Sequence, residues 1–418
     1  MKVLIVSKSD SSGGASIAAY RLYKSLIKIG ISSKMLVDHK SKNDFKVIGP
    51  VKKFDKFMVR FKPFLVSKFM KIIFKTKNPT LHSPAIFSSR LLKYINNSDA
   101  DIVHLHWVQG EMLSVKDIGS ITKPLLWTLH DTWSFCGAEH YFQDNRWIKS
   151  YNKNNRSKSE KGFDLNLWTW KRKIKFWKIP IHIITPSFWL ADKAQKSFLM
   201  RNWPIKVIPN PIDTTFWKNL NQKLLRKKFN LPNKSKLLLF GSYNANQNPI
   251  KGYDLLVSAI KVLVKDFKIK NLELIILGDK VDNSLKNLGI PIHYFGLQDN
   301  QRELRKLYNI VDGVLVPSRK ENLPNIAIEA MACSTPVISF NIGGLPEIIE
   351  HKKTGYLAKA FNIHDFAKGI NWVLTKNNKK KFKKIVRKSI TKKYSDIKIA
   401  NEYIKIFEKV IKKNYVFK

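Results

Sequence analysis

The stretch Val311–Glu350, VDGVLVPSRKENLPNIAIEAMACSTPVISFNIGGLPEIIE, decides the fold of this chain. Its apolar run Asp312–Val316 predicts a buried strand, and Pro336–Phe340 predicts a second one. Between them, apolar residues at helical spacing predict a helix that begins at Pro324, because the first helical residue needs no N–H group. Strand, loop, helix and strand in this order are typical of an α/β protein with a parallel sheet.

Two carboxylates accompany the predicted helix. Glu321 lies in the loop before it, and Glu329 lies on it, eight residues later. A carboxylate at the mouth of a parallel sheet, beside a helix N-terminus, stands where α/β folds hold ligands. Because carboxylates only accept hydrogen bonds, the two suit a ligand that is rich in hydroxyl groups. The alternative is that both are solvated residues of a surface loop and a surface helix.

The pattern around these carboxylates resembles the signature of the retaining glycosyltransferases of family 4, also called group 1. Pro317-Ser318 precedes Glu321, and the segment Ala332–Val337, ACSTPV, follows Glu329. The resemblance implies that Glu321 contacts the donor sugar and that Glu329 holds the ribose of the nucleotide. It also implies the GT-B architecture, an α/β fold of two Rossmann-like domains with parallel sheets that face a cleft.

The chain departs from the family pattern at two places. The family usually has glycines directly after the first glutamate, where Asn322 and Leu323 stand here. These two residues are expected to line the donor site with fewer flexible backbone donors, which leaves the identity of the donor sugar open. The family also usually has glycine at the position of Ser334, where a left-handed residue would close the helix.

Composition limits the number of domains and the compartment. A chain of 418 residues with 44% hydrophobic content should form two, or at most three, domains. Its two cysteines, Cys136 and Cys333, indicate neither a disulfide framework nor a zinc site, and a reducing compartment fits. The sequence contains no apolar run near the ~20 residues of a membrane span, and its start does not resemble a signal peptide. We therefore expect a cytoplasmic or peripheral protein.

The charge balance is unusual. There are 76 basic and 31 acidic residues, which gives a formal net charge of +45. Such a field favours anionic partners such as nucleic acid, anionic lipid or a phosphorylated substrate. A nucleic-acid-binding protein is thus an alternative function. However, the sequence shows no zinc pattern and no helix-turn-helix signature, and its basic residues are spread along the chain, so we expect no nucleic-acid partner.

The N-terminal region predicts a first strand, turn and helix. Lys2–Ser7 is an apolar strand, and the turn with Gly13 and Gly14 leads into a helix that ends at Gly30. The glycines of this turn can let backbone N–H groups approach a phosphate or a sugar. The alternative is a plain tight turn. The family carries glycines here, and the resemblance assigns Gly13 and Gly14 to the donor site.

The segment Val51–Lys77 differs from the rest. It has nine basic residues and one acidic residue, a net charge of +8. Its apolar residues fall at helical spacing: Phe54, Phe57, Met58, Phe61, Phe64, Leu65, Phe69, Ile72 and Ile73. This composition is typical of a helix that lies in an anionic membrane surface. The alternative is an amphipathic helix that packs on the sheet and is kinked by Pro63.

Histidines follow two further predicted strands. The strand Leu125–His130 ends at His130-Asp131, a position from which side chains reach a ligand, whereas His104 and His106 alternate with apolar neighbours and are expected to be packed. The segment from Trp127 to Tyr141 resembles a subgroup of the same family that works on bacterial surface polysaccharides. The resemblance implies that His130 lies near the reacting carbon of the donor.

Two segments before the middle of the chain carry open alternatives. The polar segment 142–164 is long enough to predict a lid or an acceptor loop. Trp168, Trp170 and Trp177 follow it and either stack on sugars or pack in the core.

Pro209–Asp213 resembles the crossing between the domains of the family. The predicted domains are therefore 1–208 on the acceptor side and 209–395 for the nucleotide sugar, with a last helix, 396–418, that packs back on the first.

The second half repeats the alternation. A strand, Lys236–Phe240, ends at Gly241, and Lys251-Gly252 stands at the start of a later helix. A cation beside free helix N–H groups suits a diphosphate, and the resemblance implies that Lys251 binds the phosphates and that Gly241 lies at the donor site. Ser242 and Tyr243 stand where many members carry an arginine, so one phosphate-binding cation is missing here.

The predicted function is the transfer of a sugar, with retention, from a nucleotide diphosphate sugar to a saccharide acceptor, which we expect to be lipid-linked and part of a bacterial surface polysaccharide. Lys251, Glu321 and His130 are the candidate catalytic residues. The donor is a substrate, so no cofactor is expected. Because no Asp-x-Asp follows a strand, we expect no metal either. The alternative is a nucleotide-sugar epimerase of the same fold.

Overall fold

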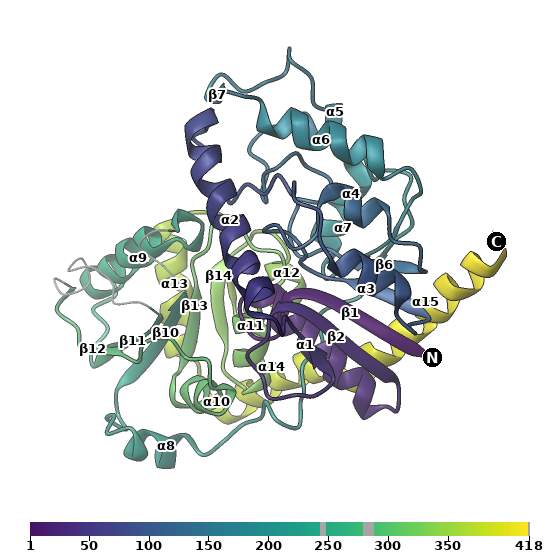
Figure 1. Cartoon of the computed structure of the whole chain (residues 1–418). Helices are drawn as coiled ribbons and strands as arrows, with labels where there is room; N and C mark the ends of the chain where they lie inside the picture. Colours follow the sequence, from purple (N-terminus) through teal and green to yellow (C-terminus); the bar gives the residue numbers. More distant parts are fainter. Residues whose placement is uncertain (243–247, 279–287, 417–418) are drawn as a thin grey trace. The chain divides into compact units, whose positions relative to one another are not determined.

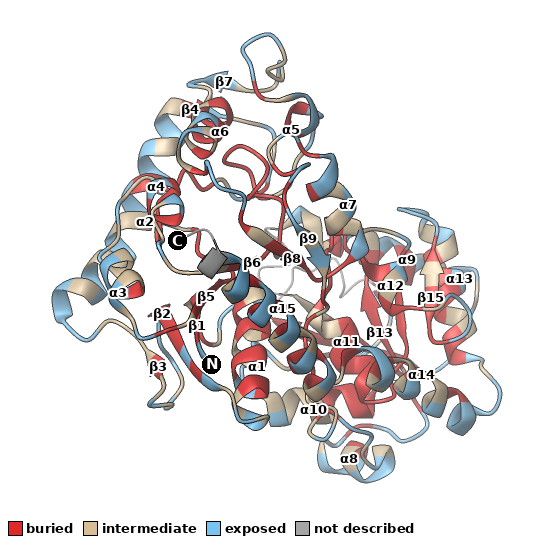
Figure 2. Cartoon of the chain, turned by 90° about the vertical axis from the view of Figure 1, so that its right-hand side faces the viewer, coloured by how far each residue is buried: buried red, intermediate tan, exposed pale blue. Residues whose placement is uncertain are grey.

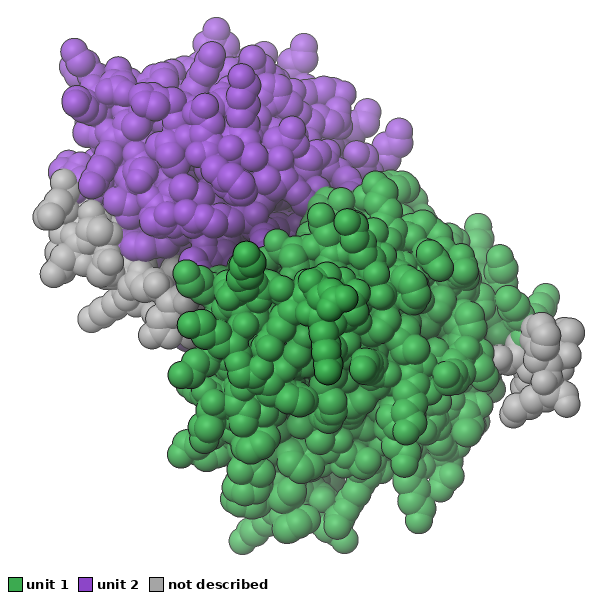
Figure 3. Space-filling model, turned by 90° about the horizontal axis from the view of Figure 1, so that it is seen from above, with its two compact units in different colours: residues 1–211, 396–418 green, residues 212–395 purple. Residues whose placement is uncertain are grey.

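The computed structural model describes residues 1–242, 248–278 and 288–416, with side chains up to residue 413. The chain forms two compact units, which Figure 3 distinguishes by colour. Unit 1 comprises Met1–Pro211 and Asp396–Lys418, and unit 2 comprises Ile212–Ser395. The chain therefore leaves unit 1, builds unit 2 without interruption and returns to unit 1.

Unit 1 is built on a parallel sheet. Seven strands lie in the order β3-β2-β1-β5-β6-β8-β9, and all neighbours are parallel. The order reverses between β1 and β5, which is the arrangement of a doubly wound fold. The strands are β1 (Lys2–Ser9), β2 (Ser32–His39), β3 (Val47–Ile48), β5 (Ile102–Leu105), β6 (Leu125–Thr128), β8 (His182–Thr185) and β9 (Ile205–Val207).

Alternating residues of β1 enter two separate cores. Val3 and Ile5 pack on one face with α1 and α15, whereas Leu4 and Val6 pack on the other face with the tryptophan-rich core. This alternation follows from the pleat of a strand, and its burial on both faces follows from helices on both sides. The helices of this unit are α1 (Gly14–Lys28), α2 (Lys53–Ile73), α3 (Leu91–Asn97), α4 (Val115–Gly119), α5 (Arg146–Lys149), α6 (Leu165–Phe176), α7 (Phe188–Lys196) and α15 (Asp396–Val416).

The last helix, α15, belongs to unit 1. It packs beside α1 and β6, far from both in sequence (Figure 1). Tyr403 on this helix is fully buried, and its hydroxyl lies 3.1 Å from Thr128 Oγ1 at the end of β6. Lys28 at the end of α1 pairs with Asp396 at 2.9 Å. The two ends of the chain thus complete one core.

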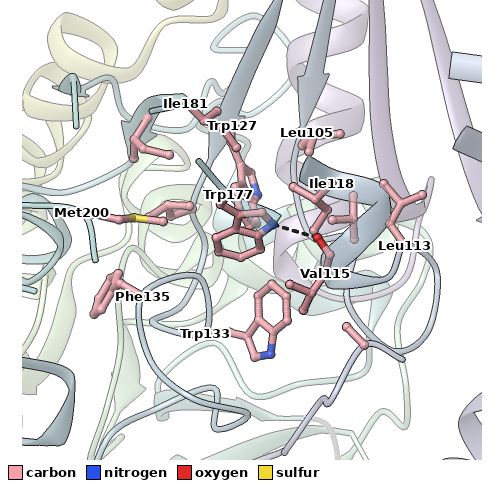
Figure 4. Close-up of a cluster of buried hydrophobic side chains, with 14 of the residues drawn as sticks. Leu105, Leu113, Val115, Ile118, Trp127, Trp133, Phe135, Trp177, Ile181 and Met200 are labelled. Atoms are coloured by element: carbon pink, nitrogen blue, oxygen red, sulfur yellow. Dashed lines mark hydrogen bonds between the residues drawn. The ribbon is translucent and has the colours of Figure 1, made fainter. Parts of the chain in front are cut away.

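Tryptophans fill the other core of unit 1. Trp127, Trp133 and Trp177 pack edge to face, and Trp177 Nε1 donates to Val115 O (Figure 4). Edge-to-face contacts between rings are favourable, and the indole N–H groups of these three tryptophans all donate to backbone carbonyls. Trp170 is also buried. For Trp170 and Trp177 the packing alternative is therefore the one that the structure shows.

The segment 142–164 contains the short helix α5 and the strand β7 (Lys161–Gly162), which pairs with β4 (Phe74–Lys75). Arg146 on α5 is buried and pairs with Asp164 at 2.7 Å and with Glu160 at 3.4 Å. A buried arginine that meets two carboxylates fixes the path of the segment. The lid or acceptor role of this loop stays a prediction.

The α2 helix is exposed. Of its residues, all of which are described, Val66 alone is buried. The aromatic stripe predicted for this segment faces solvent, with Phe57 and Phe64 more than half exposed. No helix among the described residues is both long and apolar enough to cross a membrane.

Unit 2 has a second parallel sheet in the order β12-β11-β10-β13-β14-β15. Here the order reverses between β10 and β13. The interiors of the central strands β10, β11, β13 and β14 are buried on both faces (Figure 2). The strands are β10 (Lys236–Ser242), β11 (Leu272–Gly278), β12 (Ile292–Tyr294), β13 (Gly313–Val316), β14 (Val337–Phe340) and β15 (Tyr356–Ala358).

The helices of unit 2 include the one predicted from the opening stretch. This helix, α11, begins at Asn325 rather than at Pro324. Pro324 has extended backbone, and its carbonyl accepts from Ala327, so it caps the helix from outside. The others are α8 (Gln222–Lys228), the 3-10 turn η1 (Pro249–Lys251), α9 (Tyr253–Lys265), α10 (Gln301–Ile310), α12 (Leu345–Ile348), α13 (Ile363–Leu374) and α14 (Lys379–Tyr394).

Candidate active site

The two predicted phosphate- and sugar-binding residues of unit 2 form an ion pair. Lys251 Nζ lies 2.7 Å from Glu321 Oε1, and Ser318 Oγ donates to the same oxygen at 2.9 Å. Glu321 follows β13, and Lys251 precedes α9, the helix between β10 and β11. The pair therefore lies at the carboxyl ends of the strands where the order of the sheet reverses, which is the ligand position of doubly wound folds.

Glycines allow the backbone to close around this pair. Gly252 has a φ of +66°, and a Cβ there would lie 2.0 Å from Pro317 O. Gly343 has a φ of +55°, and its Cβ would lie 1.8 Å from Glu321 O. No side chain fits at either place, so both positions require glycine. The loops that carry Lys251 and Glu321 are held against each other by these close approaches.

Glu329 is buried on α11 and has a defined partner. Its side chain is 5% exposed, and Tyr308 Oη donates to Glu329 Oε2 at 2.9 Å. Glu321 is also buried, at 9% exposure. The alternative of two solvated surface carboxylates is therefore wrong for both. A buried carboxylate with partners has a fixed orientation, which a hydroxyl-rich ligand can use.

The other candidate donor-site residues of unit 2, and the residue that closes α11, have different surroundings and backbone conformations. Asn322 and Leu323 follow Glu321 and are buried. Gly241 lies within β10, and a Cβ there would lie 3.1 Å from Ile326 Cδ1 on α11. Ser334 has a φ of +70°, the left-handed conformation expected of the residue that closes α11.

Arg319 lies beside the turn that carries Lys251. Its guanidinium meets both carboxylate oxygens of Asp254, at 2.7 and 2.6 Å, and also donates to Pro249 O at 2.9 Å. The amide of Arg319 donates to Ile250 O. Arg319 thus supports the phosphate-binding turn. Ser242 ends β10, and Tyr243, at the place of the missing arginine, lies outside the described residues.

In unit 1, Gly13 begins α1. It has a φ of +81° and a ψ of 154°, which only glycine adopts readily, and apart from its chain neighbours no described residue places an atom within 4 Å of the position of a Cβ. Gly14 is the first residue of the helix. The open space at Gly13 leaves room for a ligand at the N-terminus of α1.

His130 lies in the loop after β6, which ends at Thr128, two residues earlier than predicted. Its Nε2 lies 2.9 Å from Nδ1 of His106, which follows β5. Burial lowers the pKa of His130 to about 4, while the carboxylate of Asp131 opposes this shift. The imidazole is therefore neutral at pH 7.

His106 and His104 are packed, as predicted. Both are buried, and burial lowers the pKa of His104 to about 3 and holds that of His106 well below its ordinary value. His104 Nε2 lies 2.8 Å from Thr128 Oγ1. His106 does more than fill space, because it fixes one nitrogen of His130. The alternating pattern indicated its burial but not this contact.

A second hydrogen-bonded row supports the loop after β6. His140 Nδ1 lies 2.6 Å from Asp131 Oδ2, and Ser83 Oγ lies 2.8 Å from His140 Nε2. Trp107 Nε1 donates to the same Asp131 oxygen. Burial alone would raise the pKa of Asp131, but His140 and two N–H donors hold it below its ordinary value. All members except Trp107 are buried, so the row positions the backbone next to His130.

The structure brings Lys251 and Glu321 together in unit 2, with Glu329 on the helix that follows. Gly13, Gly14 and His130 lie at the carboxyl ends of strands in unit 1. The sequence did not indicate Ser318 and Tyr308 as partners of the carboxylates. Among the described residues there is no group of three or more histidine, cysteine or acidic side chains that could hold a metal ion.

Family models match nearly the whole chain. The model described as Glycosyltransferase Family 4 matches residues 12–216, and the model described as Glycosyl transferases group 1 matches residues 221–390. The chain belongs to the group 1 glycosyltransferases, also called family 4. The division between the two matches falls near the crossing from unit 1 to unit 2.

Named relatives of this group 1 glycosyltransferase match in part. N-acetyl-alpha-D-glucosaminyl L-malate synthase of Bacillus anthracis is 26% identical over 219 residues, which are 50% of this chain and 55% of that protein. Lipopolysaccharide 1,2-N-acetylglucosaminetransferase of Salmonella typhimurium is 27% identical over 240 residues, 53% of this chain and 60% of that protein. The chain thus matches little more than half the length of these relatives.

Solved structures match over almost the entire chain. Anabaena Alr3699/HepE, solved with UDP-glucose, has a TM-score of 0.65 at 15% identity and covers 98% of this chain and 100% of that chain. WaaG, a glycosyltransferase involved in lipopolysaccharide biosynthesis, has a TM-score of 0.63 at 13% identity and covers 97% and 99%. At such identities the likeness shows the fold, and it confirms the predicted GT-B class.

Proposed function

We propose that the protein transfers a sugar from a nucleotide diphosphate sugar to a saccharide acceptor and that the anomeric configuration is retained. The ion pair between Lys251 and Glu321 carries this proposal. An ammonium group next to the N-terminus of α9 suits a diphosphate, and the carboxylate suits sugar hydroxyls. Glu329 then serves the ribose. The HepE complex with UDP-glucose supports a nucleotide sugar as the donor.

The reaction breaks the bond between the anomeric carbon and the diphosphate oxygen and forms one between that carbon and an acceptor oxygen. Lys251 stabilises the negative charge that develops on the departing diphosphate, and one such group can be worth roughly 3 kcal/mol in a transition state. The acceptor approaches on the face that the diphosphate leaves, and its proton passes to the departing phosphate. This route requires no protein nucleophile.

His130, Gly13 and Gly14 are proposed to serve the same reaction in unit 1. From the family resemblance, His130 borders the reacting carbon. Its imidazole is neutral at pH 7, so it can donate or accept a hydrogen bond with the sugar without adding a charge. The open space at Gly13 suits a phosphate or sugar hydroxyl that approaches the first N–H groups of α1.

The acceptor is proposed to be a lipid-linked saccharide of a bacterial surface polysaccharide, such as lipopolysaccharide, O-antigen or capsule. The name of the Salmonella relative supports the lipopolysaccharide class. The protein would work at the inner face of the cell membrane, where α2, with its basic residues and exposed aromatic side chains, contacts the anionic surface.

Transfer is proposed to need neither a metal ion nor a cofactor, because the ammonium of Lys251 and helix N–H groups can meet the phosphate charge. Activity should therefore survive chelation with EDTA. Complete loss with EDTA that is restored by Mg²⁺ or Mn²⁺ would contradict this part of the proposal.

The decisive experiment offers purified protein a panel of nucleotide sugars, with and without saccharide acceptors, and measures nucleotide release. A transferase releases nucleotide in proportion to the glycoside formed, and the coupling constant of the new anomeric proton reports retention. Conversion of the nucleotide sugar into its epimer without an acceptor would instead identify an epimerase. Tight binding to nucleic acid that nucleotide sugars do not displace would instead indicate a nucleic-acid-binding protein.

A further inference from the structure

A cavity of about 530 Å³ lies within unit 1. It is lined by the carboxyl end of β2, by β3, by the first half of α2 and by the segments 88–91 and 111–112. Its volume falls in the range of roughly 300–1,000 Å³ that is usual for small-molecule sites. Neither residue of the ion pair lines the cavity, and the cavity has no role in the site described above.

The cavity lies at the ligand-binding edge of its sheet. Asp38, which lines the cavity, is near the carboxyl end of β2, and His106 and His130 follow the carboxyl ends of β5 and β6. In a parallel sheet these ends share one edge, where α/β folds bind their ligands. The position is therefore that of a substrate in the acceptor-side domain.

The lining is mostly apolar and reaches the surface. Leu36, Ile48, Met58 and Val59 are among the lining residues. Phe54 also lines the cavity and is 57% exposed, so apolar surface continues from the cavity to the outer side of α2. Apolar surface of this kind suits a hydrocarbon chain that enters from a membrane, since the free energy of transfer grows with the apolar area removed from water.

A buried carboxylate adds a polar feature to the cavity. Glu111 lines it at 4% exposure, and its Oε2 accepts from the amides of Ile86 and Phe87 at 2.8 and 3.0 Å. Its Oε1 has no hydrogen-bond partner among the described residues. This atom is itself buried from solvent, so Glu111 belongs to the packed wall of the cavity.

We propose that this cavity binds the hydrocarbon chain of the lipid-linked acceptor. The inference rests on the proposed function and specifies the acceptor as an amphiphile whose hydrocarbon chain enters unit 1. Basic residues on α2 and directly before it draw this part of the protein to the anionic surface that contains such lipids, and among them Lys62 and Lys52 line the cavity.

The test uses octyl, nonyl and decyl glucosides below their micelle-forming concentrations, with binding measured by titration calorimetry. Neutral head groups are needed, because a chain with a net charge of +45 would attract any anionic amphiphile. Each buried methylene should raise the affinity about fourfold. No vesicle is present, so binding to a surface does not contribute.

Two variants on one helix separate the cavity from the exposed stripe. Val59→Trp places a large side chain in the cavity and should abolish the gain with chain length. Phe57→Trp is the matched control, because Phe57 is 57% exposed and does not line the cavity. Since α2 buries only Val66, both variants should fold, which circular dichroism and the melting temperature would verify.

Equal affinity for all chain lengths in the native protein, or an unchanged gain with chain length in Val59→Trp, would overturn the proposal. Transfer to a soluble saccharide without a chain should persist in Val59→Trp. Failure of that transfer in the native protein would contradict the proposed function and not the chain site.

Discussion

Lys251 and Glu321 are separated by 70 residues in sequence, yet Nζ and Oε1 lie 2.7 Å apart. Each group satisfies the other where no ligand is bound. A nucleotide diphosphate sugar brings partners for both, because its phosphates can bind the ammonium and its hydroxyls can donate to the carboxylate. Donor binding would therefore replace one ion pair by an ion pair with phosphate and a charge-assisted hydrogen bond from a sugar hydroxyl.

Glu321→Gln is expected to lower transfer roughly ten- to a hundredfold, because a hydrogen bond to a charged group is worth about 1.5–3 kcal/mol. The fold should persist, since the amide can still accept from Ser318. Steady-state rates at several donor concentrations would measure the effect. Glu303→Gln on the surface of α10 is the control and should leave the rate unchanged. A native rate in folded Glu321→Gln would contradict the assignment.

Glu329→Gln and Tyr308→Phe should both weaken donor binding. Glu329 is proposed to hold the ribose, which does not react, so its loss should raise KM for the donor by a larger factor than it lowers kcat. Tyr308→Phe removes the hydroxyl that orients Glu329 and should raise KM by a smaller factor. Unchanged KM values in both variants would show that Glu329 does not contact the donor.

Gly252→Ala should destabilise unit 2 by about 2 kcal/mol or more, because a left-handed backbone and a clash with Pro317 O act together. Gly289→Ala is a matched control. Gly289 has the same φ of +66°, but no described residue outside its chain neighbours places an atom within 4 Å of its Cβ position, so the backbone cost of about 1 kcal/mol is expected. Urea unfolding of both variants would measure the difference. Equal losses would show that the close approach has no energetic role.

The folded protein should lose stability as the pH falls below 6.5. Burial lowers the pKa values of His82, His104, His106 and His130, so between their folded values and about 6.5 the unfolded chain binds more protons. Each such histidine contributes a slope of about 1.4 kcal/mol per pH unit. Burial raises the pKa of Glu139 to about 7, so between pH 4.5 and 7 the folded protein binds the extra proton at this group. Glu139 therefore stabilises the fold as the pH falls and offsets the effect of one histidine.

Unfolding free energies from pH 4.5 to 7 would measure this slope. His104→Gln should reduce it, because the variant has one fewer buried group to protonate. His364→Gln makes the same substitution at an exposed position and is the control for the substitution itself. A free energy that does not depend on pH over this range would contradict the prediction.

Charge reversal on α2 should weaken binding to anionic vesicles. Each basic residue near such a surface contributes about 1 kcal/mol. Replacing four of them by glutamate should reduce binding strongly while transfer to a soluble acceptor persists: Lys52, Lys53, Lys56 and Arg60. Salt screens the charge and not the apolar contact, so binding of the native protein should weaken with salt without vanishing.

The control for this experiment lies in unit 2. Four exposed lysines of α14 can be replaced by glutamate to give the same change in net charge: Lys380, Lys381, Lys384 and Lys388. If α2 contacts the membrane, the α14 variant should retain more binding than the α2 variant. Equal losses would show that net charge alone attracts the protein, and tight binding of the α2 variant would show that α2 does not face the membrane.

The sequence predicted the alternation of strands and helices because buried strands form continuous apolar runs. It also located Glu321 and Lys251 near strand ends, since the order of the elements sets those positions. It could not predict that the two residues form an ion pair, because that depends on which strands are neighbours in the sheet. The hydroxyl of Tyr308 was not found for the same reason: its helix meets α11 only through tertiary packing.

Strand ends were the least predictable feature. The apolar pattern continues to His130, but β6 ends at Thr128, because pairing with β8 ends there. The aromatic stripe of α2 illustrates another limit. Helical spacing predicts a helix but does not show which partner its apolar face has, and here that face is exposed.

The return of the chain to unit 1 has a consequence for its synthesis. Residues 212–395 form a contiguous unit that can fold as soon as they have left the ribosome. Unit 1 lacks α15 until residues 396–416 emerge, and the apolar positions that Tyr403 and Phe407 cover stay exposed until then. Unit 1 is therefore begun before unit 2 and completed after it. During that interval a chaperone, or the membrane itself, has an apolar surface to bind.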